Sequence, residues 1–474
     1  METGMKQDKI KILYVSAEIS PYANTGGLGE VARSFPRALI ETGNYEVRRV
    51  MPLYQLVKSK PTYVTDFTIP VDEGFETCVL KKDIDDKDLT TYFIANDRYY
   101  SREHIYAYDD DGYRFFFFCK AVVEMLKHIS FQPDIVHTND WHTGFLPLLL
   151  RKEFPNIKTV YTIHNISYHG FIPASYLKGY INKKEKIMLG YPQGLNFMKA
   201  GIHFSDFVTT VSPGYAYEIQ SQENSYGMDT SLKRRKNNII GILNGIDNII
   251  YNPSTDEHIP YPYDADCYER KKLNRTALRE KYGLPDKEIP LLVMVTRFNY
   301  AKGIDILLKA ISYMELSTFQ VLILGSGNTH DQRKYSSVSA IYGDNVVVEV
   351  NYNESLARKI YAAADIYLMP SLFEPCGLGQ MYALRYGAIP IVNPVGGLKD
   401  TVIDLEQDVL NATGFYMEEW SEKALAKAMK KAIATYHTKE WDKLVLNGMR
   451  QKFTWEHSVQ EYNKLYETLY RAIV

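Results

Sequence analysis

The sequence predicts an α/β protein made of two doubly wound domains with parallel sheets, which face each other across a cleft. Three observations predict this fold class. Short β-branched or aromatic runs recur along the chain, helical patterns lie between several of them, and the alternation stops once near the middle before it starts again. A chain of 474 residues is long enough for two domains of roughly 250 and 200 residues.

The first half begins with a strand over residues 10–15, a glycine-rich turn and an amphipathic helix over residues 30–40. A second helical pattern covers residues 115–128. Further strands are expected at 134–137, 160–163 and 207–211, because each apolar run is followed by polar residues or by Gly and Pro and is too short for a helix.

The second half repeats this scheme after a Pro-, Tyr- and Asp-rich break at residues 251–264. We expect a helix at 303–313. The predicted strands of this half cover residues 291–295, 319–324, 346–350, 366–369 and 389–392. Both halves therefore have the alternation that is typical of Rossmann-like domains.

The predicted boundaries give an N-terminal domain of residues 1–250 and a C-terminal domain of residues 251–455. From Val459 onward, apolar residues recur on one helical face, and Thr454 is placed to cap the start of that helix. We expect the helix at 456–474 to pack back on the N-terminal domain.

Composition excludes several classes of protein. The chain has 55 Lys and Arg residues and 57 Asp and Glu residues, so its net charge is −2. This nearly neutral charge gives no excess of basic residues that would bind nucleic acid or an anionic membrane. Four dispersed cysteines argue against a disulfide framework or a structural zinc site. The first nine residues are polar, and no apolar run approaches the ~18 residues of a membrane span. We expect a soluble, cytoplasmic protein.

The glycine-rich turn after the first strand contains Gly26 and Gly27. Glycines allow close approach of the backbone to a ligand, and the following helix N-terminus offers N–H groups to a phosphate. The spacing is not G-x-G-x-x-G, and no acidic residue stands out ~20 residues later at a strand end, which disfavours a dinucleotide site. A tight turn without a ligand is the alternative interpretation.

Polar and aromatic side chains also follow two later strands, where ligands of open α/β sheets bind. Asp140 and Trp141 follow the strand at 134–137, and His164 and Asn165 follow the strand at 160–163. Hydrogen bonds and ring stacking from such residues suit a sugar. The alternative is a helix-capping Asp140 beside a buried Trp141, with a structural histidine.

In the second half, Arg297 ends one strand and Lys302 opens the next helix. Two cations around a helix N-terminus form an anion clamp suited to a diphosphate, although surface cations are also common. The loop at 370–379 carries Glu374, whose charge should face sugar hydroxyls because a carboxylate is disfavoured beside phosphate.

Several ordered motifs together resemble the bacterial and plant glycogen and starch synthases, which are retaining glycosyltransferases of the GT-B fold. The resemblance covers nearly the whole chain. The motifs are TGGLGEV, NDWH, TIHNISYHG, TTVSPGYAYEI, ILNGID, TRFNYAKGIDIL, PSLFEPCGLGQMYALRYGAIPIV and GGLKDTV.

The resemblance implies that glucose passes from a nucleotide-glucose to the non-reducing end of an α-1,4-glucan. It implies catalytic roles for Glu374, His164, Arg297 and Lys302, with the two cations on the donor diphosphate. The donor-binding positions that it implies are Gly26, Gly27, Asn244, Cys376, Gly377 and Leu378. The implied sugar pocket contains Tyr100, Asp140, Trp141 and Asn165. No metal or other cofactor is expected, and the nucleotide-sugar is a substrate.

The chain departs from the family pattern at Asn24, where a lysine is usual, and at Glu30, where an aspartate is usual. It also has Asn393-Pro394-Val395 before the late Gly-Gly-Leu, where the family often carries basic residues. Loss of the lysine removes one cation from the donor site, which puts the identity of the donor in doubt more than the class of reaction. ADP-glucose is favoured from the family, with UDP-glucose as the alternative. The run Asp109-Asp110-Asp111 could bind a metal, but a solvated acidic turn is the favoured interpretation.

Other functions stay open at this point. One is a GT-B transferase with a different donor and acceptor, and another is a sugar-nucleotide epimerase or hydrolase on a similar scaffold. A catalytically degenerate glucan-binding protein is a third. The expected partners are the nucleotide-glucose and the glucan, without nucleic acid or membrane, and the sequence does not indicate an oligomeric state.

Overall fold

A computed structural model describes residues 9–71, 74–85 and 87–473. The polar segment that precedes residue 9 lies outside the described residues, as does the last residue of the predicted C-terminal helix. Contacts divide the chain into two compact units. The N-terminal unit runs to Gly245 and includes the chain from Trp455 onward, and the C-terminal unit is Ile246–Thr454.

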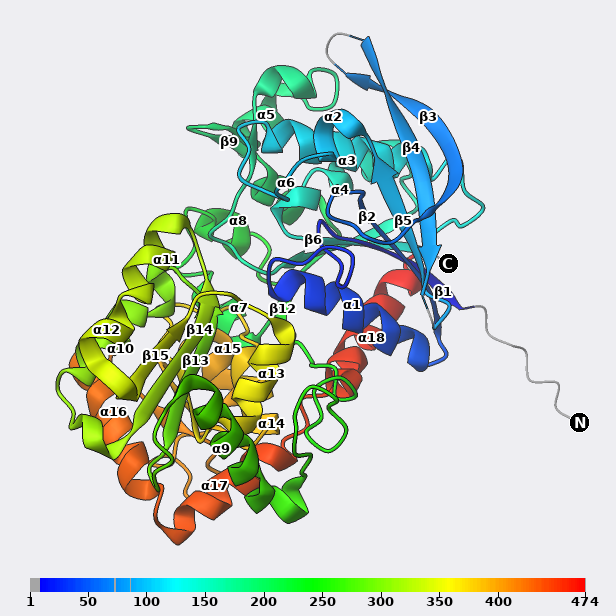
Figure 1. Cartoon of the computed structure of the whole chain (residues 1–474). Helices are drawn as coiled ribbons and strands as arrows, with labels where there is room; N and C mark the ends of the chain where they lie inside the picture. The colour runs from blue at the N-terminus through cyan, green and yellow to red at the C-terminus, as the bar shows by residue number, and fades with distance from the viewer. Residues whose placement is uncertain (1–8, 72–73, 86, 474) are drawn as a thin grey trace, which may run out of the picture. The chain divides into compact units, whose positions relative to one another are not determined.

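A nine-stranded sheet forms the core of the N-terminal unit (Figure 1). Its strands, in spatial order, are β12 (Ile239–Gly241), β11 (Phe207–Thr210), β7 (Lys158–Ile163), β6 (Ile135–Asn139), β1 (Ile10–Val15), β2 (Tyr45–Pro52), β5 (Thr90–Ala95), β4 (Gly74–Ile84) and β3 (Thr62–Val71). From β12 to β5 every neighbouring pair is parallel. The chain adds strands on one side of β1 and then returns to the other side at β6, so a topological switch point lies between β1 and β6.

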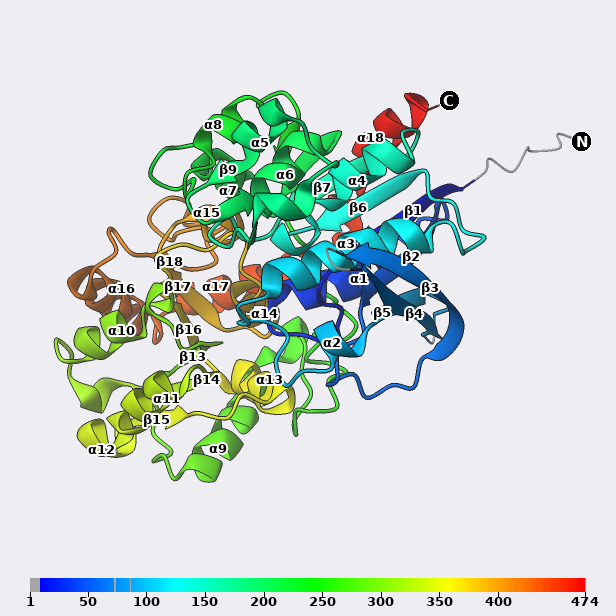
Figure 2. The ribbon, with the colours of Figure 1, turned by 90° about the horizontal axis from the view of Figure 1, so that it is seen from above.

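The strands β3 and β4 extend this sheet as an antiparallel ribbon at its edge (Figure 2). They interrupt the alternation of strand and helix on which the sequence interpretation relied. A small antiparallel sheet also joins β8 (Phe171–Ile172), β10 (Gly194–Asn196) and β9 (Gly190–Tyr191). Before the last helix of the chain, the described helices of the unit are α1 (Gly27–Glu41), α2 (Asp97–Tyr100), α3 (Asp111–Met125), η1 (Trp141–Thr143), α4 (Leu146–Glu153), η2 (Ala174–Leu177), α5 (Lys183–Leu189), α6 (Phe197–Phe204), α7 (Pro213–Glu218) and α8 (Asp229–Lys233).

The last helix, α18 (Trp455–Arg471), packs beside α1 and β6 within the N-terminal unit (Figure 1). The hydroxyl of Tyr466 lies 2.6 Å from Nδ1 of His137, which is buried in β6. The rings of Phe35 in α1 and Tyr462 in α18 are 4.4 Å apart between centroids. Ser458 donates to the carbonyl of Leu243, so the helix is anchored by polar as well as aromatic contacts.

The C-terminal unit contains a six-stranded parallel sheet with helices on both of its faces (Figure 1). Its spatial order is β15 (Val346–Glu349), β14 (Gln320–Ser326), β13 (Leu291–Arg297), β16 (Ile366–Met369), β17 (Ile389–Val392) and β18 (Phe415–Tyr416). In order of the chain this is 3-2-1-4-5-6, the doubly wound order of dinucleotide-binding folds. The switch point lies between β13 and β16.

Helical segments connect these strands and complete the unit. They are η3 (Ala265–Arg270), α9 (Lys271–Tyr282), η4 (Tyr300–Lys302), α10 (Ile304–Ile311), η5 (Leu316–Thr318), α11 (Thr329–Ser336), α12 (Val338–Tyr342), η6 (Gly343–Asn345), α13 (Glu354–Ala363), α14 (Gly379–Arg385), α15 (Gly396–Thr401), α16 (Glu422–Thr435) and α17 (Lys439–Arg450). Among the described residues, none of the helices has both the length and the apolar character that a membrane crossing requires.

Candidate active site

The glycine-rich turn between β1 and α1 is held by a buried carboxylate. Glu18, 3% exposed, accepts hydrogen bonds from the backbone N–H of Thr25 at 2.5 Å and from its hydroxyl at 2.7 Å. The hydroxyl of Tyr106 donates to the same carboxylate at 2.6 Å. Gly26 and Gly27 directly follow this anchor, at the first turn of α1. The loop is therefore fixed by side chains before any ligand is present.

Asn24 and Glu30, which both depart from the family pattern, contact each other. The amide nitrogen of Asn24 donates to Glu30 at 2.6 Å, and its amide oxygen accepts from the backbone N–H of Gly26 at 2.9 Å. A Cβ added at Gly29 would lie 2.7 Å from that amide oxygen, so the side chain of Asn24 packs closely over the start of α1. Asn24 thus has a structural role at the turn.

The ends of β6 and β7 are tied together by Asp140. Its Oδ1 accepts from the backbone N–H groups of His164 at 2.8 Å and Asn165 at 3.1 Å. Asp140 has a φ of 56°, in the left-handed region, and its side chain makes no capping hydrogen bond to η1. Burial raises the pKa of Asp140 to about 7, although the two N–H groups oppose this shift.

The imidazole of His164 is oriented by Asn139. The amide nitrogen of Asn139 donates to the carbonyl of Val15 at 3.0 Å, which leaves its amide oxygen to face Nε2 of His164 at 2.9 Å. Nε2 therefore carries the proton and Nδ1 the lone pair. Burial lowers the pKa of His164 to about 3, so the ring is neutral near pH 7.

Three other predicted positions lie in less accessible surroundings. Trp141 is 9% exposed, and its ring packs against Phe115 and Phe197 at 5.1 and 5.7 Å between centroids. This burial agrees with the alternative interpretation of Trp141 as a buried tryptophan. Asn244 is 6% exposed, after β12. The amide oxygen of Asn165 accepts from the hydroxyl of Ser167.

Tyr100 corrects the predicted sugar pocket. Its side chain is 0% exposed, and its hydroxyl donates to the carbonyl of Arg114 at 3.0 Å. The ring packs edge-on to Tyr54 at 6.0 Å between centroids. Tyr100 therefore presents no surface to a sugar in this structure, because it is part of the hydrophobic core.

In the C-terminal unit, the two cations follow β13. Arg297 is exposed at the end of the strand, and its guanidinium makes no hydrogen bond or ion pair with another described residue. Lys302 ends η4, and its ammonium donates to Oε2 of Glu374 at 2.6 Å. The ammonium has three donors, so two remain for an anion.

Glu374 follows β16, which is the strand on the other side of the switch point. Its Oε2 also accepts from the hydroxyl of Ser371 at 3.0 Å, whereas no described residue donates to its Oε1. The side chains of Lys302 and Glu374 are 19% and 10% exposed. The topology thus brings together two of the candidate site residues, which lie 72 positions apart in the chain.

The predicted donor-binding residues Cys376, Gly377 and Leu378 connect Glu374 to α14. Gly377 has a φ of 72°, which favours glycine. The side chain of Gln380 donates to the carbonyls of Cys376 and Gly377, each at 3.0 Å. These contacts hold the loop against the start of α14.

The acidic run is engaged in ion pairs with arginines. Asp110 binds Arg102 at 2.5 Å, and Asp111 binds Arg114 at the start of α3. Among residues 9–71, 74–85 and 87–473, no group of three or more His, Cys, Asp or Glu side chains is arranged to hold a metal ion.

Three organising residues escaped the sequence interpretation. Glu18 anchors the glycine-rich turn, Asn139 orients His164, and Ser371 binds Glu374. Asn139 lies inside the NDWH motif and Ser371 inside the motif that begins PSLFEPCGL, so both could have been selected there. Glu18 had no signal beyond its position between a strand and a candidate ligand-binding loop.

Comparison with known proteins agrees with this arrangement. Residues 11–234 match the family model described as Starch synthase catalytic domain, and residues 274–447 match Glycosyl transferases group 1. A glycogen synthase of Moorella thermoacetica is 40% identical over 470 residues, which cover 96% of each chain.

Solved structures show the same likeness. The catalytic domain of Starch Synthase IV from Arabidopsis thaliana, bound to ADP and acarbose, aligns with a TM-score of 0.89 and 31% identity, covering 98% of this chain and 100% of that one. Sucrose-phosphate synthase from Thermosynechococcus elongatus aligns at 0.66 with 20% identity, covering 98% and 100% of the two chains, and supports the fold alone. The two Rossmann-like sheets and the GT-B class are thereby confirmed, and the chain belongs to the glycogen and starch synthase family of glycosyltransferases.

Proposed function

We propose that this protein transfers glucose from a nucleotide-glucose, with ADP-glucose preferred, to the non-reducing end of an α-1,4-glucan with retention of configuration. The observation that carries this proposal is the Lys302–Glu374 contact of 2.6 Å beside the switch point, with the exposed Arg297 at the end of β13, the strand that precedes Lys302. This arrangement offers positive charge to a diphosphate and a carboxylate oxygen to a sugar.

The relatives support the same substrates. The curated relatives are glycogen synthases, and the starch synthase structure was determined with ADP and acarbose, a nucleoside diphosphate and a carbohydrate. Both compounds match the kinds of ligand that a nucleotide-glucose donor and a glucan acceptor require.

In the proposed reaction, the bond between the anomeric carbon and the diphosphate oxygen breaks, and a bond from that carbon to the acceptor hydroxyl oxygen forms on the same face. The diphosphate oxygen receives the proton of the acceptor hydroxyl. Arg297 and Lys302 stabilise the negative charge that develops on the leaving group. We propose that these cations make a metal cofactor unnecessary.

The remaining residues would position the sugar. Oε1 of Glu374 is placed to accept hydrogen bonds from sugar hydroxyls, because Lys302 and Ser371 use only Oε2. A neutral His164 can accept a hydrogen bond from a sugar hydroxyl at Nδ1, and because it takes up no proton it adds no positive charge next to the oxocarbenium-like sugar.

The direct test is transfer of labelled glucose to glycogen from ADP-glucose and from UDP-glucose, each with and without EDTA. We expect elongation from ADP-glucose at the higher rate, no loss in EDTA, and products that an α-1,4-specific amylase digests. Arg297→Ala and Lys302→Ala should lower kcat/KM by about 10²–10³. Lys427→Ala, which breaks an exposed Lys–Glu pair in the same unit, is the matched control and should leave kcat/KM unchanged.

The same assay addresses the choice of donor. Asn24→Lys places a cation at the glycine-rich turn and should lower the KM for the donor, and the ratio of the two donors reports whether this position sets the preference. Absence of elongation from either nucleotide-glucose would refute the proposed function.

A further inference from the structure

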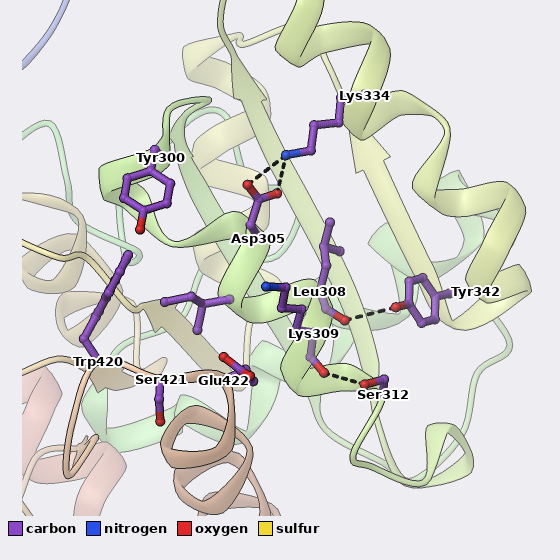
Figure 3. A pocket seen from close by; sticks show the side chains of 11 residues that line it. Tyr300, Asp305, Leu308, Lys309, Ser312, Lys334, Tyr342, Trp420, Ser421 and Glu422 are labelled. Atoms are coloured by element: carbon purple, nitrogen blue, oxygen red, sulfur yellow. Dashed lines mark hydrogen bonds and ion pairs between the residues drawn. The ribbon is translucent and has the colours of Figure 1, made fainter.

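A pocket of about 650 Å³ lies on the C-terminal unit, between α10 and the start of α16 (Figure 3). None of Arg297, Lys302 and Glu374 lines it. The pocket has a size that is typical of small-molecule sites, so it can hold a ligand in addition to the substrates of the reacting cluster.

Two aromatic rings form one end of the pocket. Tyr300 is 68% exposed, and its ring lies 5.4 Å from that of Trp420 between centroids, at an interplanar angle of 75°. Figure 3 shows these two rings together, with Tyr342 at the opposite end. The indole N–H of Trp420 already donates to the carbonyl of Pro370 at 2.9 Å, which holds this ring in place. Preorganised aromatic faces of this kind suit the apolar face of a sugar ring.

The charges that line the pocket cancel. Asp305 and Glu422 carry negative charge, and Lys309 and Lys334 carry positive charge, which gives −2 + 2 = 0. Asp305 and Lys334 bind each other at 2.6 Å, as the dashed lines in Figure 3 show. A balanced set of donors and acceptors favours a neutral, hydroxyl-rich ligand over a phosphate or a nucleotide.

We infer that this pocket, named here the α10–α16 pocket, is a second carbohydrate site that holds a segment of the α-1,4-glucan. The inference rests on the proposed function for the identity of the sugar. The aromatic rings would stack on glucosyl units, and the ends of Lys309 and Glu422 would bind their hydroxyls. Neither of these two charged groups has an ion-pair partner among the described residues.

The location suggests what the site does for the enzyme. Tyr300 belongs to η4, the segment that ends at Lys302, and Trp420 is bound to Pro370, at the start of the loop that carries Glu374. A glucan held here remains attached to the enzyme between transfers, which raises the effective concentration of chain ends. Loss of the site should therefore affect long glucans more than short ones.

Calorimetric titration with maltoheptaose tests the inference without any donor. We expect the wild-type chain to bind two molecules. Tyr300→Ala and Trp420→Ala should weaken one of the two sites at least about tenfold, because a stacking face is lost, whereas Tyr300→Phe and Trp420→Phe, which keep the rings, should retain it. Tyr313→Ala, at an exposed tyrosine just after α10 and outside the pocket, is the matched control and should bind as the wild type does.

Kinetics supply a second measurement. The ratio of the KM for glycogen to the KM for maltotriose should rise about tenfold in Tyr300→Ala and stay constant in Tyr313→Ala. A single maltoheptaose site in the wild type, or two intact sites in both alanine variants, would overturn the inference. So would a change in oligomeric state of Tyr300→Ala by sedimentation, since the pocket would then be an interface between copies of the chain.

The two proposals fail in different ways. A protein that binds two maltoheptaose molecules and transfers no glucose would refute the proposed function and keep the carbohydrate pocket. A protein that elongates glycogen normally while both alanine variants bind as the wild type does would refute the pocket alone.

Discussion

Glu374 illustrates how a single carboxylate is kept in a partly buried place. The Lys302 ammonium at 2.6 Å balances its charge, and the Ser371 hydroxyl at 3.0 Å satisfies the same oxygen. Removal of one partner of such a pair leaves the other charge uncompensated, which costs more than an exposed ion pair contributes. The Lys302–Glu374 pair therefore fixes the position of the Glu374 carboxylate and also compensates its charge.

Asp140 supports a prediction about pH. Burial raises its pKa to about 7, so below pH 7 the folded protein binds a proton that the unfolded chain, with a pKa near 3.8, has released. The contribution of Asp140 to the free energy of unfolding thus falls as the pH rises from 4 to 7. In Asp140→Asn the amide oxygen can still accept both backbone N–H groups, and this pH dependence disappears.

We expect the unfolding free energy of Asp140→Asn, relative to wild type, to be larger at pH 8 than at pH 5 by up to about 3 kcal/mol. Urea denaturation at the two pH values measures this difference. An equal difference at both pH values would show that Asp140 is ionised throughout.

At the scale of elements, α18 shows why the end of the chain matters to the N-terminal unit. The hydroxyl of Tyr466 meets Nδ1 of His137, and the other ring nitrogen lies 2.5 Å from the hydroxyl of Thr162. Both nitrogens of this buried histidine are therefore satisfied, one of them only by α18. The contact between Tyr466 and His137 therefore stabilises both the docking of α18 and the buried part of β6.

Tyr466→Phe should lower the free energy of unfolding of the N-terminal unit by about 1–3 kcal/mol, because a buried ring nitrogen loses its partner. Tyr470→Phe is the control on the same helix, since Tyr470 is half-buried and its hydroxyl makes no hydrogen bond to another described residue. Thermal denaturation of both variants measures the effect, and equal stability of the two would contradict it.

The regular elements were predictable because they depend on local pattern. The strands expected at 10–15, 366–369 and 389–392 coincide with β1, β16 and β17 at both ends. The antiparallel strands β3 and β4 were not anticipated, because they leave much of their surface exposed and follow no strand–helix alternation. The strand–helix alternation is interrupted at residues 251–264. This segment nevertheless packs within the C-terminal unit, because the ring of Tyr251 stacks on that of Tyr382 at 3.8 Å between centroids.

At the scale of the whole molecule, buried histidines are concentrated in the N-terminal unit. Burial lowers the pKa of His137 and His164 to about 3 and that of His203 to about 4, and it lowers the pKa of His142 as well. The unfolded chain takes up protons at these positions below about pH 6.5, whereas the folded unit does not. Acid should therefore destabilise this unit.

We expect the unfolding temperature of the N-terminal unit to fall as the pH decreases from 7 to 5, with each of these histidines contributing up to about 1.4 kcal/mol per pH unit. Calorimetry at three pH values, with proteolysis to identify which unit unfolds first, provides the measurement. A decrease confined to the C-terminal unit would contradict the prediction.

The sequence by itself determined the α/β class, the positions of most parallel strands, the family, and the loops that hold the candidate residues, because hydrophobic period and motif spacing are local properties of the chain. Only the tertiary structure decided how each candidate side chain is used. It placed Tyr100 in the core, Asn24 against Glu30, and Lys302 against Glu374. The reason is that burial and hydrogen bonding depend on neighbours brought from distant parts of the chain, and these neighbours do not appear in a local pattern.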